Sequence, residues 1–263
     1  MAPSSLSMRD INVLEKMKDP EANPALGVIA DSSLPKDPHI TDQSLYERVS
    51  QKEREVILSM KELETELAKI QTPQTSDYIE PYKACISRLG ELIAEHPNYA
   101  SARNNRAQAI RRLYGDNMLV SNAPALPQAL VVEASSKERT DAAETALGDL
   151  DKAIQLLSPR SPFAPMSPTA KNTLSLAYTQ RAAIYHSTSK YIASSSSQVE
   201  AQRREAKWTS LQFEEAASRD FASGGRFGNE IAKSLAVSTN PTAKLCGQMV
   251  QEMMRKEYGS VQS

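Results

Sequence analysis

The sequence predicts an all-α protein, and three observations support this fold class. Apolar residues make up 40% of the 263 residues but aromatic residues only 5%, so alanine and leucine must supply most of the core. Glycines are few and runs of β-branched residues are rare, which favours helices over a sheet. From Ser44 onward, apolar side chains recur at helical spacing with charges between them. A chain of this length can bury a substantial core as one large domain or two small ones.

The first 43 residues differ from the rest of the chain. Prolines interrupt a polar run in the segment DPEANPALGVIADSSLPKDPHITD. Proline has no amide hydrogen and interrupts regular helices. We expect residues 1–43 to be largely disordered.

The remaining chain divides into eight helical segments. Each carries apolar residues at helical spacing and is bounded by proline, glycine or a polar run. The predicted segments are 44–70, 76–97, 100–115, 140–159, 172–189, 199–221, 229–237 and 240–259.

Polar residues predict where several of these helices begin. Asp77 with Glu80, and Asp141 with Glu144, have the spacing of a capping box. Asn240 precedes a proline, which predicts an N-cap followed by the first helical position.

The glycine-rich segment SGGRFGNE, residues 223–230, raises the question of a phosphate-binding loop. It lacks the Gly-Lys-Ser/Thr ending and the preceding strand that such a loop needs. We therefore predict that one helix stops at Gly224 and Gly225 and that Asn229 caps the next.

The final helix is expected to close the domain. An apolar stripe on this helix would pack against the preceding helices, and Gly259 would end it. The stripe consists of Leu245, Cys246, Met249, Val250 and Met253.

Small residues recur at matching places in successive helices. Only a small side chain fits where two helix backbones come close, and larger neighbours fill the space beside it. The small residues are Ala107, Ala146, Ala153, Ala182 and Ala216, and the matching large ones are Leu89, Leu150 and Phe213. The pattern resembles the tetratricopeptide repeat, a pair of antiparallel helices in about 34 residues. This resemblance implies an α-solenoid of about three helix pairs with a C-terminal capping helix.

The repeat period defines the expected domain organisation. The tetratricopeptide-like domain spans residues 44–258. Its repeats cover about 44–97, 98–159 and 170–223, followed by capping helices over 228–258. We expect an insertion at 117–139 and a Ser-rich loop at 188–198 to leave the stack as surface loops. The insertion is apolar enough to pack back onto the solenoid or to cover its groove.

Three motifs resemble those of one particular family of tetratricopeptide repeat proteins. HPNYASARNNRAQAIRRLYGD, ALGDLDKAIQLL and NPTAKLCGQMVQEMM look like segments of the tetratricopeptide repeat protein 36 family, over roughly residues 77–258. The long first helix, the middle insertion and the Ser-rich loop depart from that family. The resemblance implies heat-shock chaperone binding and control of tyrosine catabolism.

The Arg-rich helix 100–115 supplies the candidate binding site. Aligned with the first helix of a repeat, it presents polar side chains to the concave face, which binds extended peptides in many such proteins. Amides there can hydrogen-bond a peptide backbone, and arginine can hold a carboxylate bidentately. The candidate partner-binding residues are Asn104, Asn105, Gln108, Arg111, Arg112 and Gln180.

Some tetratricopeptide repeat proteins hold the acidic C-terminal tail of a chaperone with a set of lysine, arginine and asparagine side chains, called a carboxylate clamp. This sequence matches that set poorly. Asn105 matches the clamp asparagine of the middle repeat. Leu176 and Gln180 stand where the third repeat should offer lysine and arginine. We therefore do not expect capture of an acidic tail by that clamp.

No arrangement of residues predicts catalysis. The three histidines, His39, His96 and His186, lack metal-binding or nucleophile spacing. The two cysteines, Cys85 and Cys246, are too few for a disulfide framework or a zinc site. We expect no enzyme activity, no cofactor and no metal.

The charge balance and the hydropathy of the chain indicate which cellular compartment and which classes of partner to expect. The chain has 31 basic and 32 acidic residues, a net charge of −1, without the basic excess typical of nucleic-acid binders. No window approaches the roughly 18 apolar residues of a membrane span, and the N-terminus lacks the apolar core of a secretory signal. We expect a cytoplasmic protein, with the nucleus as a second compartment.

The expected function is that of a protein-binding adaptor or co-chaperone-like scaffold, whose partner is a heat-shock chaperone or a metabolic enzyme. Three alternatives stay open. One is nucleic-acid contact through the arginines of helix 100–115 and the segment AQRREAK. Another is an enzyme with an unrecognised pocket. The third is a homo-oligomeric module that uses Met249, Met253 and Met254 of the last helix.

Overall fold

The computed structural model of the protein describes residues 28–69, 76–120, 123, 126, 129–161, 164–195, 199 and 203–258. Within these residues it contains eight α-helices and no β-strand, which confirms the all-α fold class. The helices are α2 (Gln43–Leu67), α3 (Ser76–Glu95), α4 (Ala100–Tyr114), α5 (Ser136–Leu157), α6 (Pro168–Ser194), α7 (Ser210–Arg226), α8 (Glu230–Ser238) and α9 (Pro241–Tyr258).

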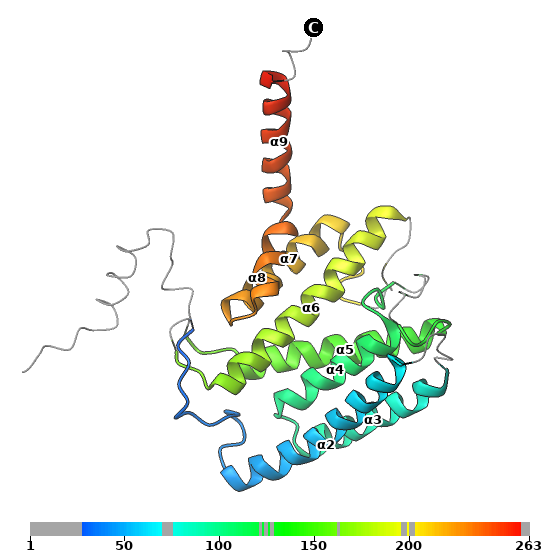
Figure 1. Ribbon diagram of the computed structural model, residues 1–263, viewed down its shortest axis with the longest axis vertical. Helices are drawn as coiled ribbons and strands as arrows, with labels where there is room; N and C mark the ends of the chain where they lie inside the picture. Colours follow the sequence, from blue (N-terminus) through cyan, green and yellow to red (C-terminus); the bar gives the residue numbers. More distant parts are fainter. Residues whose placement is uncertain are drawn as a thin grey trace, which may run out of the picture.

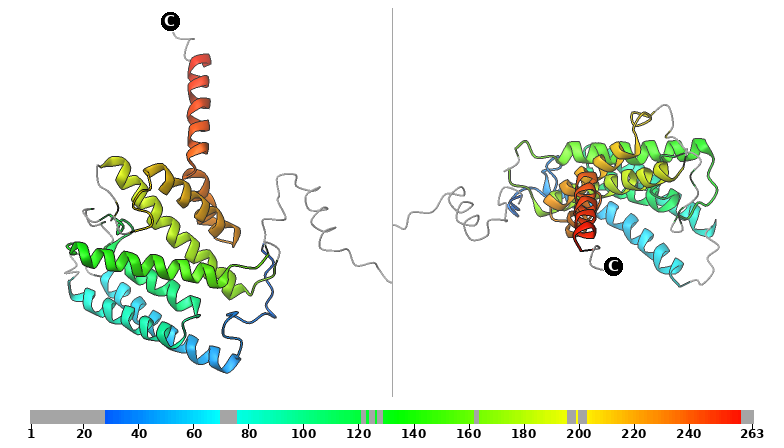
Figure 2. Two further views of the ribbon diagram at one scale, coloured as in Figure 1. Left: turned by 180° about the vertical axis from the view of Figure 1, so that it is seen from behind. Right: turned by 90° about the horizontal axis from the view of Figure 1, so that it is seen from above.

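Helices that follow each other in the chain pack against each other from α2 to α8 (Figure 1). Helices α2 and α3, α4 and α5, and α6 and α7 form three pairs stacked side by side (Figure 2). Helix α4 also contacts α6 directly. As a result, α4 lies in the middle of the stack and has neighbours on several sides.

The small residues expected at helix crossings are buried. Ala107, Ala146, Ala153 and Ala182 have no exposed surface, and Ala216 is buried as well. The three matching large residues, Leu89, Leu150 and Phe213, are also fully buried. Close backbone approach therefore explains much of the alanine in these helices.

Helix α5 begins earlier than the sequence pattern indicated. Its N-cap is Ser135, whose hydroxyl accepts a hydrogen bond from the Glu138 backbone N–H at 3.1 Å. Asp141 and Glu144, predicted as a capping box, lie inside the helix. The prediction was wrong because Ser135 and Glu138 offer the same spacing one and a half turns earlier.

Helix α7 starts later than predicted and continues through the two glycines. Thr209 and Gln212 form its capping box, and the helix ends at Arg226. The predicted stop at Gly224 and Gly225 was therefore wrong. A Cβ atom on Gly225 would lie 2.8 Å from the Lys233 Cα atom of α8, so the glycine is needed for a close helix crossing. The turn falls instead at Gly228, which has a φ of 106°.

Asn229 caps α8 as predicted, and its side-chain oxygen accepts from the Ala232 backbone N–H at 3.0 Å. The Asn240 cap of α9 is also confirmed, with the Thr242 N–H at 2.9 Å from its side-chain oxygen.

Residues 28–42 are ordered along the junction of α5 and α6, unlike the disorder expected for residues 1–43. The Asp31 N–H donates to the Met166 carbonyl at 2.8 Å, and the Met166 N–H donates to the Ile29 carbonyl at 2.9 Å. Val28 and Ile40 are buried. The segment is held because it supplies both hydrogen bonds and apolar contacts. Residues 1–27 lie outside the described residues.

The described part of the insertion 117–139 folds back onto the end of α4. Leu119, Val120 and Leu130 are buried. The Val131 N–H donates to the Leu113 carbonyl at 2.9 Å, which satisfies one of the carbonyls left open at a helix C-terminus.

The predicted Ser-rich loop is partly helical. Helix α6 continues to Ser194, and Thr188 and Ser189 are buried within it. Residues 196–198 of that loop lie outside the described residues.

Helix α9 does not cap the domain. It leaves the end of α8 and projects away from the stack (Figure 1). The apolar stripe expected to be buried is exposed instead, with 57% of Leu245 and 60% of Met253 accessible. With only nine residues, α8 is too short to offer an antiparallel surface for the 18 residues of α9.

We expect Gly225→Ala to destabilise the protein by about 1–3 kcal/mol, because the new methyl group would meet the backbone of α8. The control is Gly148→Ala on α5, where a Cβ atom would meet nothing within 4 Å. That change should stabilise the helix by about 0.5–1 kcal/mol. Urea denaturation measures both, and equal effects of the two substitutions would contradict the close crossing.

Candidate functional site

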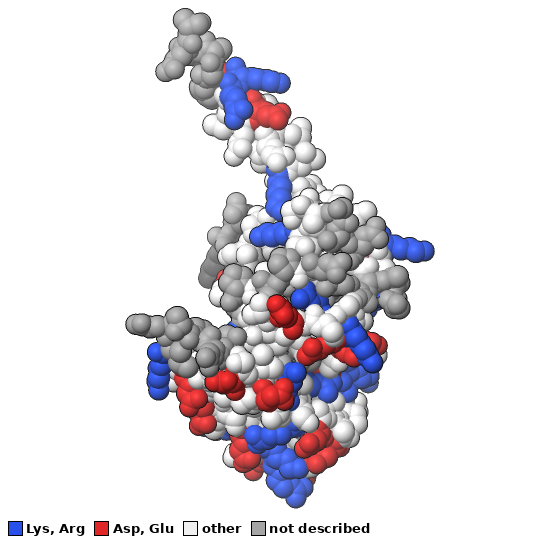
Figure 3. All heavy atoms as spheres, turned by 90° about the vertical axis from the view of Figure 1, so that its right-hand side faces the viewer, with Lys and Arg blue, Asp and Glu red and all other residues white. Residues whose placement is uncertain are grey.

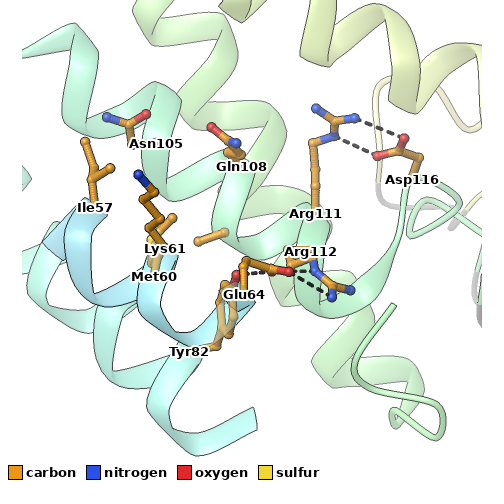
Figure 4. A pocket seen from close by; sticks show the side chains of 11 residues that line it. Ile57, Met60, Lys61, Glu64, Tyr82, Asn105, Gln108, Arg111, Arg112 and Asp116 are labelled. Carbon is orange, nitrogen blue, oxygen red and sulfur yellow. Dashed lines mark hydrogen bonds and ion pairs between the residues drawn. The ribbon is translucent and has the colours of Figure 1, made fainter. Parts of the chain in front are cut away.

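A groove of about 510 Å³ lies between α2 and α4, with Tyr82 of α3 at its base (Figure 4). Apolar side chains from α2 and α4 form part of its wall, and amide and charged groups surround them. The lining residues are Ile57, Met60, Lys61, Glu64, Tyr82, Asn105, Gln108, Ala109, Arg111, Arg112 and Asp116. Four of the six predicted site residues are therefore brought together in this groove.

Asn104 and Gln180, the other two predicted residues, are buried outside the groove lining. The Gln180 amide donates to the Asn104 side-chain oxygen at 2.8 Å. Both side chains are at most 6% exposed. They connect α4 to α6 inside the protein and are not available to a peptide.

Asn105 uses an amide N–H to hold a buried carboxylate. Its Nδ2 donates to the Glu53 Oε1 atom of α2 at 2.7 Å. The Tyr99 hydroxyl donates to the other oxygen of Glu53. Burial raises the pKa of Glu53, although the hydrogen bonds from Tyr99, Ser101 and Asn105 oppose this shift. The hydrogen bond from Asn105 therefore offsets part of the free-energy cost of burying the Glu53 carboxylate at the edge of the groove.

The Arg111 guanidinium is held by Asp116, just beyond the end of α4, and by Gln180 of α6. The guanidinium donates to both carboxylate oxygens of Asp116 at 2.7 and 3.0 Å. A third nitrogen donates to the Gln180 Oε1 atom at 3.1 Å.

Arg112 forms a second bidentate pair, with Glu64 of α2, at 2.6 and 3.2 Å (Figure 4). The Tyr82 hydroxyl also donates to Glu64. Burial opposes ionisation of Glu64, but the bonds from Arg112 and Tyr82 outweigh it and lower the pKa of Glu64. Arg111 and Arg112 therefore already form bidentate pairs within the protein, and neither guanidinium is available to bind a ligand carboxylate in the same way.

Lys61 and Gln108 are the exposed polar side chains of the groove, one on α2 and one on α4 (Figure 4). Neither forms an ion pair or a side-chain hydrogen bond within the part of the chain that the structure describes. Beside them, Ile57 is 37% exposed. The predicted set, on helix 100–115 and at Gln180, did not include Ile57, Met60 or Lys61, because helical spacing does not show that α2 lies beside α4.

The remaining arginines of α4 are also paired. Arg103 and Arg106 share the buried Asp149 of α5, at 2.9 and 2.6 Å. In the segment before α7, Arg204 pairs with Glu205 and with Asp151. On the face shown in Figure 3, basic and acidic side chains are interspersed over the body of the protein. This distribution counts against a basic surface for a nucleic-acid backbone.

The acidic groups that line the groove are paired. Glu64 and Asp116 each hold an arginine. Among the described residues, no group of three or more His, Cys, Asp or Glu side chains could hold a metal ion. No helix in the described segments is long and apolar enough to cross a membrane.

Together, the fold and the groove define a helical protein of stacked helix pairs with an open groove along one side. The L-tyrosine degradation gene cluster protein hmgX of Aspergillus fumigatus is 35% identical to the chain over 260 residues, which cover 98% of the chain and 95% of hmgX. The chain belongs to the family of this protein. No family model and no solved structure matches the chain.

We expect Glu53→Gln to change how stability depends on pH. Because burial raises the pKa of Glu53 above 4.5, the folded protein holds this proton more tightly than the unfolded chain does. Ionisation of Glu53 therefore lowers stability as pH rises through the folded pKa. The glutamine variant avoids this cost, so its stability relative to wild type should increase from about pH 4 to about pH 7. Urea denaturation across this range tests it, with the exposed Glu55→Gln as control; a pH-independent difference would contradict the interpretation.

Asp149→Ala should destabilise the protein by about 3 kcal/mol, because it leaves Arg103 and Arg106 without their buried carboxylate. Asp141→Ala, at an exposed position of the same helix, should change stability by less than about 0.5 kcal/mol. Thermal and urea denaturation measure both. A loss for Asp141→Ala as large as that for Asp149→Ala would contradict these roles.

Proposed function

We propose that the protein is a non-enzymatic adaptor that binds a protein partner in L-tyrosine degradation. The observation that carries this proposal is the groove between α2 and α4, which combines apolar side chains with two uncommitted polar groups, Lys61 and Gln108. The name of the A. fumigatus relative supports the pathway.

The stacked pairs α2–α3, α4–α5 and α6–α7 support a tetratricopeptide-like solenoid as the architecture of this adaptor. In such a stack, the first helix of each pair lines a common face. Glu53 and Glu64 of α2 reach Asn105 and Arg112 of α4, as neighbouring first helices would. A solenoid of this kind presents an extended surface for a partner segment.

The chemistry of the groove indicates what kind of segment it binds. Ile57 and Met60 offer apolar contact, and Gln108 can both donate to and accept from a peptide backbone. Lys61 can meet one acidic side chain. Because Arg111 and Arg112 already hold Asp116 and Glu64, a strongly acidic chaperone tail has few groups to bind. We therefore favour a metabolic enzyme of the pathway as the partner, in the cytoplasm.

A pull-down with a matched control tests the groove. The groove variant is Lys61→Glu/Gln108→Glu. The control is Lys152→Glu/Gln155→Glu on α5, which makes the same changes outside the groove. From cells supplied with L-tyrosine, wild type and control should retain the same protein. The groove variant should retain about tenfold less, which corresponds to about 1.4 kcal/mol of lost binding.

Function in the pathway is tested in A. fumigatus lacking hmgX. Wild type and the control variant should restore L-tyrosine consumption, and the groove variant should not. Equal recovery of the partner by all three forms would contradict the groove as the binding site. Recovery of nucleic acid alone, with steep loss at higher salt, would contradict the adaptor function.

A further inference from the structure

Helix α9 has an apolar face that nothing in the described part of the chain covers. Five large apolar side chains on it are 54–60% exposed, and Cys246 is exposed as well. Its link to the body includes the ion pair of Lys244 with Glu214 of α7. An isolated helix of about 18 residues is marginal in water, so such a helix gains most of its stability from packing. We therefore expect the exposed apolar stripe of α9 to pack against another surface.

The apolar stripe of α9 has the same spacing when read in either direction. It consists of Leu245, Cys246, Met249, Val250, Met253 and Met254. In an antiparallel pair of α9 helices centred between residues 249 and 250, Leu245 faces Met254, Cys246 faces Met253 and Met249 faces Val250. Every apolar residue then meets an apolar residue, as a two-fold interface requires.

The direction in which α9 projects also favours this arrangement. The helix points away from the body (Figure 1) and is about 27 Å long at 1.5 Å per residue. In an antiparallel pair, the two bodies would lie at opposite ends of the helices and would not collide. A parallel pair would bring both bodies to the same end.

The charges on α9 favour a protein surface over a lipid surface. The helix carries Lys244, Arg255 and Lys256 together with Glu252 and Glu257, so its charges nearly cancel. Helices that lie on membranes usually have a strongly basic polar face. The stripe is therefore better suited to a second protein chain.

We propose that α9 makes the protein a homodimer by antiparallel packing of its apolar stripe against α9 of a second copy. The interface is separate from the groove between α2 and α4, so each dimer presents two grooves. The dimer goes beyond the adaptor function and does not depend on it.

Sedimentation of the full chain tests the dimer. Wild type should sediment with twice the chain mass at about 100 µM, a concentration suited to a small interface. Met249→Glu, at the centre of the stripe, should sediment as a monomer. Gln251→Glu adds the same charge on the opposite face of α9 and should stay dimeric. An unchanged thermal transition of Met249→Glu would show that the body is still folded.

Cross-linking tests the antiparallel direction. Met253→Cys places a thiol opposite Cys246 of the other copy, so mild oxidation should form a disulfide-linked dimer faster than in wild type. Efficient cross-linking of wild type, whose Cys246 faces only Met253 in the antiparallel pair, would indicate a parallel pair and overturn the proposal. A wild-type monomer at this concentration, or flotation of monomers with phosphatidylserine vesicles, would overturn it too.

Discussion

The position of α4 inside the stack determines much of the structure. Helices α3, α5 and α6 pack against α4, and side chains of α2 reach it. The charged groups of α4 must therefore find opposite charges within the protein, since a buried charge without a partner is costly. Arg112 pairs with α2, and Arg103 and Arg106 pair with Asp149 of α5. The same helix reaches α6 through Asn104 and Gln180. One helix thus connects three successive helix pairs.

These pairings also determine what the groove can bind. A sequence rich in arginine suggests a surface for acidic ligands, but each guanidinium on α4 already contacts a carboxylate. The groups that remain exposed are an amide, Gln108, and a lysine from the neighbouring helix, Lys61, beside apolar side chains. Such a surface favours a segment of mixed polarity over a phosphate backbone. In the proposed adaptor, the internal ion pairs would therefore link the stability of the stack to the selectivity of its groove.

The two ends of the described chain complete the stack differently. Residues 28–42 run along the junction of α5 and α6 and contribute Ile40 to the smaller hydrophobic cluster, with Val49 and Tyr99. At the other end, α8 packs against α7 through Gly225, but α9 leaves the body with its apolar face exposed. A helix in that position resembles the unpaired half of another helix pair. A second copy of α9 would bury that face, whereas the body of the same chain does not.

The sequence alone determined the helical class, the buried alanines and the caps at Asn229 and Asn240, because spacing and capping chemistry are local. It also indicated that Asn105, Gln108, Arg111 and Arg112 lie together, since they share one helix. Only the tertiary structure decided which of these side chains remain available. Glu53, Glu64 and Gln180, distant in sequence, bind Asn105, Arg112 and Asn104. Likewise, α9 has a suitable apolar stripe, yet whether that stripe is buried depends on the length of α8 and the direction in which the chain leaves it.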